Sequence, residues 1–273
     1  MPQPCALAAR SRPFVKWAGG KSQILGSLLP TLPASFGRYY EPFVGGGSVF
    51  FALAPRRATL ADVNAHLIDT YRAVQAHVEA LIVTLAALPH DRDTFYRVRA
   101  LPWRKLGLVD RAARVLYLNR NCFNGLWRVN AQDEFNVPFG RNSQNSLAYP
   151  DTLRRAARAL AGVRLVAGDV FALCRRVRRG DLVYFDPPYH AIAPARSFVG
   201  YSRPPFAEPQ QRRLAALFAR LAGRGVHVVL SNADTPLIRE LYRPFRLRKI
   251  FARRAINRDP RGRGPVAELI ITA

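Results

Sequence analysis

The stretch Arg38–Ala54, "RYYEPFVGGGSVFFALA", begins with β-forming aromatic residues, turns at three consecutive glycines and continues as an apolar helical pattern. This order predicts a strand that leads through a tight turn into a helix. Gly45 and Gly47 form a G-x-G pair, which lets the backbone approach a ligand closely at the start of a helix. The third glycine of the dinucleotide fingerprint would stand at position 50, where the chain has Phe50. A pyrophosphate is therefore not the expected ligand.

The next strand pattern, "ATLADVN" at 58–64, ends in an acidic residue. Asp62 follows Gly45 at about the separation at which nucleotide-binding folds place an acid against the ribose hydroxyls. Together these features favour a nucleoside ligand without a pyrophosphate, a description that S-adenosylmethionine fits. The alternative is a turn that serves only tight packing, since glycine-rich turns between strand and helix are common.

Strand and helix patterns alternate on both sides of a long helical stretch. Helical periodicity dominates residues 65–121, and residues 121–150 are rich in Asn, Gly, Pro and aromatic residues, which is typical of a hairpin with irregular loops. After residue 151 the alternation returns, which predicts a mostly parallel sheet covered on both faces. We therefore expect one domain from residues 1–63 and 151–273, and a second, inserted domain from residues 64–150.

The chain has 42 Lys and Arg against 18 Asp and Glu, a formal net charge of +24. This excess favours a polyanionic partner, and nucleic acid before a membrane surface, although an arginine- and alanine-rich composition is also what a GC-rich genome produces. Cys5, Cys122 and Cys174 are too widely spaced for a zinc site and fit no disulfide framework. No apolar run approaches the ~18 residues that span a bilayer, and the first residues lack the apolar stretch of a signal peptide. We expect a reduced, cytoplasmic protein without a membrane partner.

The segment "WAGGKS" ends like a phosphate-binding loop, with Gly20, Lys21 and Ser22 in order. At the place of that motif's first glycine the chain has Val15, and no strand pattern precedes the segment. The pattern excludes a nucleoside triphosphatase of that type.

A second informative stretch is "DLVYFDPPYH", Asp181–His190. A run of β-formers stops at Asp186, and Pro187 and Pro188 prevent further ladder pairing. One interpretation is a strand that simply ends in a solvated acid. The other is a site for a planar amine: Asp186 accepts one N–H, and the Pro187 carbonyl, fixed by the proline pair, accepts the other. Two acceptors would free the nitrogen lone pair for reaction, and Tyr189 would stack on the base. This chemistry needs no metal.

Seven blocks, spread from Phe14 to Thr235, occur in the order seen in adenine-N6 DNA methyltransferases of the Dam type, and the chain resembles that family. The blocks are "FVKWAGGK", "EPFVGGGSVF", "LADVN", "LNRNCFNGLWRVN", "EFNVPFG", "DPPY" and "SNADT". The resemblance implies a doubly wound, seven-stranded Rossmann-like α/β sheet with an inserted, mainly helical DNA-recognition domain that carries a β-hairpin. It also implies S-adenosylmethionine as methyl donor, double-stranded DNA as partner, and flipping of the target adenine out of the helix.

The resemblance assigns roles residue by residue. Asp186, Pro187, Pro188 and Tyr189 match the catalytic motif. The positions that match donor contacts are Trp17, Lys21, Glu41, Phe43, Gly45, Gly47, Asp62 and Asp186. For Trp17 the alternative is a core aromatic, and for Lys21 a solvated lysine.

The positions that match DNA contacts are Lys16, Asn124, Leu126, Arg128, Pro138, Phe198 and Tyr201. Arginine or lysine bidentate to guanine is the commonest specific base contact, which makes Lys16 and Arg128 the expected readers. Phe206 continues the aromatic series of a loop expected to close over the flipped base. By resemblance the target is GATC, but Phe123 stands where relatives often carry tyrosine and Trp127 is also unusual, so the target sequence stays open. The segment "RRAINRDPRGRG" is either a phosphate contact or a solvated turn.

Two alternatives to this activity remain. One is a methyltransferase that acts on another planar amine, RNA adenine or the N4 of cytosine. The other is a basic DNA-binding protein with a decayed active site, which the intact Asp-Pro-Pro-Tyr motif disfavours. We expect the protein to be a monomer.

Overall fold

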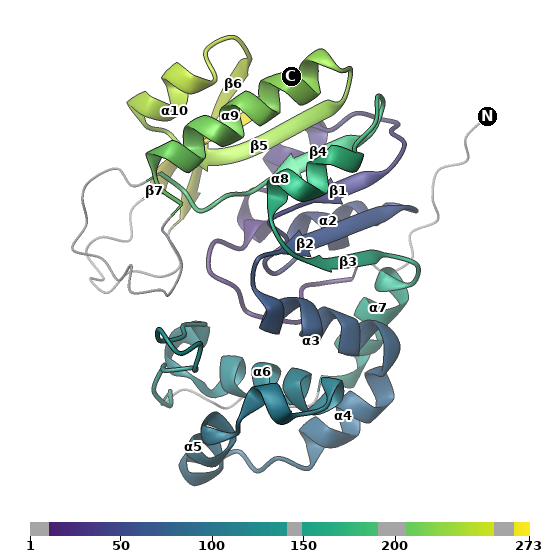
Figure 1. Ribbon diagram of the computed structural model, residues 1–273, viewed down its shortest axis with the longest axis vertical. Helices are drawn as coiled ribbons and strands as arrows, with labels where there is room; N and C mark the ends of the chain where they lie inside the picture. Colours follow the sequence, from purple (N-terminus) through teal and green to yellow (C-terminus); the bar gives the residue numbers. More distant parts are fainter. Residues whose placement is uncertain (1–10, 141–148, 191–205, 254–264) are drawn as a thin grey trace.

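The computed structural model describes residues 11–140, 149–190, 206–253 and 265–273. Its centre is a seven-stranded sheet in the order β3-β2-β1-β4-β5-β7-β6 (Figure 1). The strands are β1 Tyr39–Glu41, β2 Ala58–Asp62, β3 Arg164–Ala167, β4 Leu182–Phe185, β5 His227–Ala233, β6 Arg246–Arg253 and β7 Pro265–Thr272. The pairs among β1 to β5 are parallel, and β7 runs antiparallel to both β5 and β6. The predicted α/β fold with a mostly parallel, seven-stranded sheet is confirmed.

Alternate side chains of the central strand β4 enter two hydrophobic clusters, one on each face of the sheet. Leu182 and Tyr184 belong to the first cluster, and Val183 and Phe185 to the second. This period of two is the signature of a strand buried on both faces, which explains why "LVYF" reads as an uninterrupted apolar run.

Helices cover both faces, as alternating strand and helix patterns predict. The first cluster takes side chains from α1 (Leu25–Leu28) and α2 (Ser48–Leu53), whereas the second takes them from α8 (Val170–Leu173), α9 (Glu208–Gly223) and α10 (Pro236–Leu241). Figure 1 shows α9 crossing in front of the sheet. Short 3-10 turns complete this part: η1 Lys21–Gln23, η2 Leu29–Thr31 and η5 Cys174–Arg176.

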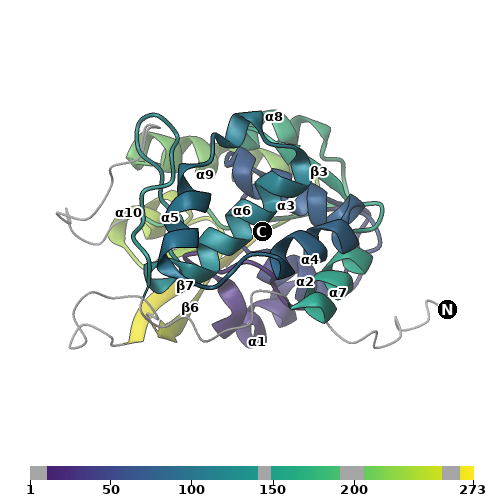
Figure 2. The same cartoon turned by 90° about the horizontal axis from the view of Figure 1, so that it is seen from below.

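The helical stretch between β2 and β3 forms a layer at one end of the sheet. It comprises α3 (Ala65–Ala76), α4 (Val78–Ala86), α5 (Arg92–Ala100), η3 (Trp103–Lys105), α6 (Leu108–Asn121) and α7 (Pro150–Leu160). Figure 2 shows α3 to α6 in front of the strands when the molecule is seen from below. α3 packs against α6, but also against β2 and β3, and one hydrophobic cluster continues from the sheet into the helices. The proposed boundary at residue 64 therefore lies within a continuous core.

After α6 and the 3-10 turn η4 (Phe123–Gly125), the chain folds back on itself without regular strands. Isolated antiparallel bridges join Cys122 to Phe139 and Val129 to Phe135, and the Asn130 N–H donates to the Glu134 carbonyl over 2.8 Å. This is the expected hairpin with irregular loops. The ladder stays broken because Pro138 has no N–H to donate and the η4 turn bends one arm.

Among the helices that the structure describes, none is long and apolar enough to cross a membrane.

Candidate active site

Three acidic residues meet at the carboxyl ends of neighbouring strands. β1 ends at Glu41, β2 ends at Asp62, and β4 leads directly into Asp186. β1 lies between β2 and β4, at the point where the strand order reverses direction. In open α/β sheets, ligands bind in the crevice at this switch point, outside the carboxyl ends of the strands. The sheet topology therefore brings together the predicted donor residues and the predicted catalytic residue.

Asp186 is fixed by two side chains that are distant in sequence. The Lys21 ammonium lies 2.8 Å from one carboxylate oxygen, and the Ser231 hydroxyl donates to the other over 3.0 Å. Burial raises the pKa of Asp186, while the charge and the hydrogen bond of Lys21 and the hydrogen bond from Ser231 act in the opposite direction. Lys21 thus favours the ionised carboxylate, the form that can accept an N–H. Ser231 lies on β5, and sequence analysis assigned it no role.

The backbone after Asp186 is held by buried amides. The Gln211 side chain donates to the Pro188 carbonyl over 2.9 Å and accepts from the Asn232 amide over 3.1 Å. Asn232 in turn accepts the backbone N–H of His190 over 3.2 Å. Gln211 and Asn232 are both completely buried, so this chain of hydrogen bonds sits in a low-dielectric environment where it is strong. It fixes the course of the Pro-Pro-Tyr segment.

The Pro187 carbonyl accepts no hydrogen bond from any residue that the structure describes. The carbonyl of the neighbouring Pro188, by contrast, is engaged by Gln211. The geometry thus leaves one backbone acceptor beside Asp186 without a donor from the described chain, as the amine-binding interpretation requires.

Two contacts fix the Tyr189 side chain, one at its hydroxyl and one at its ring. Its hydroxyl donates to Glu268 of β7 over 3.0 Å, and the Lys21 ammonium lies 4.7 Å from the centre of its ring. The ring therefore has a fixed orientation, with a cation against it. Stacking of Tyr189 on a base stays a prediction.

Glu41 is a buried carboxyl group with an unusual pKa. Only 2% of its surface is exposed, and this burial raises its pKa to about 8, although the hydrogen bond from the Tyr39 hydroxyl (2.9 Å) acts against the rise. At neutral pH the group is mostly protonated in the free protein. A cation bound next to it would favour the ionised form.

The glycine turn is organised by Asp62. One carboxylate oxygen accepts the Gly45 N–H over 3.2 Å, and the other accepts the Asn64 N–H over 2.9 Å. Gly47 has φ +71°, and a Cβ there would lie 2.7 Å from the Tyr71 hydroxyl, so the turn requires glycine at this position. Asp62 thus shapes the turn, and its predicted contact with a ribose stays a prediction.

Trp17 packs against this turn, and Phe43 lies just before it in the chain. A Cβ on Gly45 would lie 2.9 Å from the Trp17 ring, so Trp17 packs directly on the turn. The Trp17 ring also stacks on Trp127 at 6.4 Å between centroids. Phe43 lies edge-on to Phe206 at 5.6 Å. Trp127 belongs to the predicted DNA-reading segment, so Trp17 joins that segment to the glycine turn.

The predicted DNA-reading residues are held together by Asn119, which sequence analysis did not select. Asn119 is completely buried. Its amide donates to the carbonyls of Lys16 (2.8 Å) and Gly125 (2.9 Å), and its oxygen accepts the Lys16 N–H over 2.9 Å. Lys16 and the η4 turn are thereby fixed as one unit. The only sequence signal was the presence of Asn119 in the block "LNRN".

The other DNA-reading candidates lie along this broken hairpin. Arg128 donates to Asn136 through its Nε (2.6 Å to the side chain) and through Nη2 (3.2 Å to the carbonyl), and Asn124 has a positive φ of 56°. Leu126 follows the η4 turn, and the Pro138 carbonyl accepts the Phe123 N–H over 3.0 Å. Phe198 and Tyr201 lie outside the described residues, as do Cys5 and most of the arginine-rich segment before β7.

We expect Asn119→Ala to lower the free energy of unfolding by about 2–3 kcal/mol, because the substitution leaves buried backbone groups of Lys16 and Gly125 without partners. It should also reduce discrimination between DNA sequences, since Lys16 would no longer be held against η4. Urea unfolding and competition binding with altered duplexes measure the two effects. Asn130→Ala, which removes a half-buried asparagine whose side chain organises the turn at 130–134 of the same segment, is the control. Unchanged discrimination in a destabilised Asn119→Ala protein would contradict the positioning role.

The described residues contain no group of three or more His, Cys, Asp or Glu side chains that could hold a metal ion.

An acid-Pro-Pro-Tyr turn beside a glycine turn at the switch point of this sheet is the arrangement of a methyltransferase with a Rossmann-like fold. The chain belongs to the family of D12 class N6 adenine-specific DNA methyltransferases, whose family model matches residues 17–256.

Individual relatives agree with this assignment along nearly their whole length. The chain is 36% identical over 269 residues to a type II methyltransferase of Lactococcus lactis subsp. cremoris, covering 96% of this chain and 95% of the relative. It is 34% identical over 284 residues to a type II methyltransferase of Methanocaldococcus jannaschii (95% and 98% covered). It is 33% identical over 265 residues to the DNA adenine methylase of Escherichia coli strain K12 (96% and 95% covered). The protein is thus an adenine-specific DNA methyltransferase by family, as the sequence blocks predicted.

Proposed function

We propose that the protein transfers the methyl group of S-adenosylmethionine to the N6 amine of an adenine that has been flipped out of double-stranded DNA. The observation that carries this proposal is the pair of acceptors at the end of β4. The Asp186 carboxylate is oriented by Lys21 and Ser231, and the neighbouring Pro187 carbonyl has no donor among the described residues. Two acceptors side by side match the two N–H bonds of an exocyclic amine.

The residues at the switch point fit the proposed donor. Gly45 and Gly47 both have positive φ (49° and 71°), a backbone conformation that other residues rarely adopt, so the sharp turn proposed to approach the donor requires glycine. Glu41 is a buried acid suited to a cationic group, and Asp62 ends β2 where an acid meets a ribose. Trp17 offers an aromatic face beside the turn. Bound here, S-adenosylmethionine would supply an already activated methyl group.

The chain's own groups would then act on the amine. Asp186 and the Pro187 carbonyl accept its two hydrogens and draw the nitrogen toward a tetrahedral shape, which frees its lone pair. As the new C–N bond forms, the C–S bond of the donor breaks, and the nitrogen afterwards loses one proton. Asp186, whose pKa burial raises, is placed to receive that proton. The buried amides Gln211 and Asn232 hold the backbone that follows Pro187, while Lys21 and Ser231 orient Asp186.

We further propose that residues 64–150 form the target-recognition domain and that Lys16 and Arg128 read guanines of a GATC site. Support comes from Asn119, which fixes Lys16 to the η4 turn, and from Trp17, which stacks on Trp127 and so couples the reading segment to the donor turn. Arg128 would exchange its contact with Asn136 for a base.

Modification mapping of DNA from a methylation-free host that expresses the chain tests this proposal. We expect N6-methyladenine at GATC, and none in a host that expresses Asp186→Ala. Methyladenine in another sequence would contradict the GATC site alone. N4-methylcytosine, or modification confined to RNA, would contradict the proposed substrate, and absence of any modification would favour a decayed enzyme.

A proton measurement tests the assignment of Glu41. At pH 6.5 the amino group of the donor is already protonated, since its ordinary pKa is about 7.7–8.0, and Glu41, with its pKa of about 8, is protonated as well. Binding of the cationic donor should lower the pKa of Glu41 and release up to about one proton per molecule bound. Calorimetry in two buffers of different ionisation enthalpy counts these protons. Glu41→Gln should release none, and equal release by both proteins would rule out the contact.

A further inference from the structure

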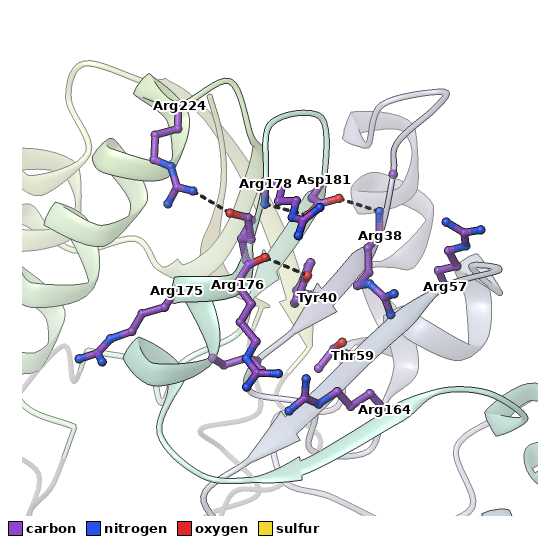
Figure 3. A pocket seen from close by; sticks show the side chains of 13 residues that line it. Arg38, Tyr40, Arg57, Thr59, Arg164, Arg175, Arg176, Arg178, Asp181 and Arg224 are labelled. Carbon is purple, nitrogen blue, oxygen red and sulfur yellow. Dashed lines mark hydrogen bonds between the residues drawn. The ribbon is translucent and has the colours of Figure 1, made fainter.

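A second concave site lies at the opposite end of the strands. Its cavity has a volume of about 740 Å³ and is lined at the amino ends of β1, β2, β3 and β4 (Figure 3). The catalytic candidates stand at the carboxyl ends of these strands, so the two sites are separate. Arginines dominate the lining: Arg38, Arg57, Arg164, Arg175, Arg176, Arg178 and Arg224.

The charge of this cavity is not neutralised by the protein. Its one carboxylate, Asp181, accepts the backbone N–H groups of Arg38 (2.9 Å) and Arg178 (2.8 Å). Within the described part of the chain, none of the seven guanidinium groups forms an ion pair, and Arg224 donates instead to the Val177 carbonyl over 2.8 Å. By contrast, arginines on α7, α9 and α10 pair with acidic side chains. Seven like charges gathered around a hollow that holds a single carboxylate indicate a site for an anion.

Arg164 and Arg176 face a common space (Figure 3). Figure 3 shows the side chains of Arg164 and Arg176 turned toward each other near Thr59. Three of these arginines also affect the pKa of the Tyr40 hydroxyl. Burial and the charge of Asp181 raise this pKa, whereas the charges of Arg38, Arg178 and Arg164 lower it. Because Asp181 accepts the backbone N–H groups of Arg38 and Arg178, it fixes the backbone from which these two arginines project.

The side chains that line the cavity favour phosphate groups as the ligand. Guanidinium groups bind phosphate oxygens in a bidentate fork, and several such groups match several phosphates. The lining offers no aromatic face for a base, since Tyr40 is buried and its hydroxyl donates to the Arg176 carbonyl. The cavity lies within the range of about 300–1,000 Å³ that is usual for small-molecule sites.

We propose that this cavity binds a compact polyphosphate, two or three linked phosphate groups recognised without a base. A DNA duplex is too wide to enter a cavity of 740 Å³, since its major groove alone is about 12 Å wide. A duplex would therefore touch only the rim of the cavity.

Titration of the full chain with inorganic tripolyphosphate at constant ionic strength, followed by calorimetry, tests this proposal. We expect saturable binding that weakens at least about tenfold in the double variant Arg164→Gln/Arg178→Gln, because charge-assisted bidentate contacts are lost. The control, Arg243→Gln/Arg248→Gln, removes the same charge outside the cavity and should bind like the unchanged protein. Both side chains of the test variant are exposed, so we expect an unchanged thermal midpoint and unchanged methyl transfer.

Each other outcome overturns the proposal. Equal weakening in both double variants would show general attraction to a basic protein. No weakening in either variant would place the ligand elsewhere. A short duplex that displaces tripolyphosphate, and whose own binding depends on Arg164 and Arg178, would make the cavity rim a DNA contact. Because methyl transfer is assayed separately, failure here leaves the proposed function untouched.

Discussion

Asp186→Ala is expected to lower kcat for methyl transfer by about a thousandfold or more, since removal of a single group that stabilises developing charge costs about 10²–10³ in rate, and this side chain would also receive the proton. DNA affinity should change little, because Asp186 would contact only the amine of the flipped base, whereas the other proposed DNA contacts come from Lys16 and the segment around η4. A filter-based transfer assay with labelled donor and a fluorescence binding assay measure the two quantities.

The control for this prediction is Ser231→Ala. It removes the hydrogen bonds of the Ser231 hydroxyl to one carboxylate oxygen of Asp186 and to the Tyr184 hydroxyl and should cost far less activity than Asp186→Ala. Substantial turnover by Asp186→Ala, with the fold intact, would refute the role of this carboxylate.

The second large effect is expected for Lys21→Met, in the pH dependence of kcat. Lys21 lies 2.8 Å from Asp186, and its positive charge opposes the rise that burial causes in the pKa of Asp186. Without Lys21 the pKa of this carboxyl group rises further. Activity needs the ionised form, which is present above the pKa and lost as pH falls through it, so the acid limb of the profile should move to higher pH. At neutral pH we expect kcat to fall at least about tenfold.

Part of this lost activity should return at alkaline pH, a recovery that a merely structural defect would not show. The profile must be recorded at saturating donor, because Lys21 also lies at the proposed donor site. Lys249→Met, which removes a lysine on β6 that pairs with Asp234, is the control. An acid limb at the same pH in Lys21→Met and the unchanged protein would show that Lys21 does not set the ionisation of Asp186.

The architecture was accessible from sequence because its signals are local. A few neighbouring residues are enough to predict each of three features: the strand "LVYF", the glycine turn after β1 and the acid at the end of β2. Their meeting at one edge follows from the topology of a parallel sheet. This is why Asp62 and Asp186 could be selected from the sequence pattern, whereas Glu41 was selected through the resemblance to the family.

The contacts that tune the site were not accessible, because they join residues far apart in the chain. Lys21 was expected to touch the donor, but its pairing with Asp186 depends on where the fold places η1 relative to the residue that follows β4. Ser231, Gln211 and Asn119 are polar residues on apolar elements, and only burial reveals that each one fixes a functional backbone or carboxylate. The arginine cavity is likewise assembled from loops and strand starts that are distant in sequence.

The central claim is that a carboxylate and a peptide oxygen converge on the amine of a flipped adenine. A crystal structure of the protein with its duplex and a non-reactive analogue of the donor measures this directly. We predict the adenine N6 within hydrogen-bonding distance, about 2.7–3.2 Å, of both an Asp186 carboxylate oxygen and the Pro187 carbonyl. An extruded adenine whose N6 contacts neither group, with Asp186 still engaged only by Lys21 and Ser231, would contradict the account.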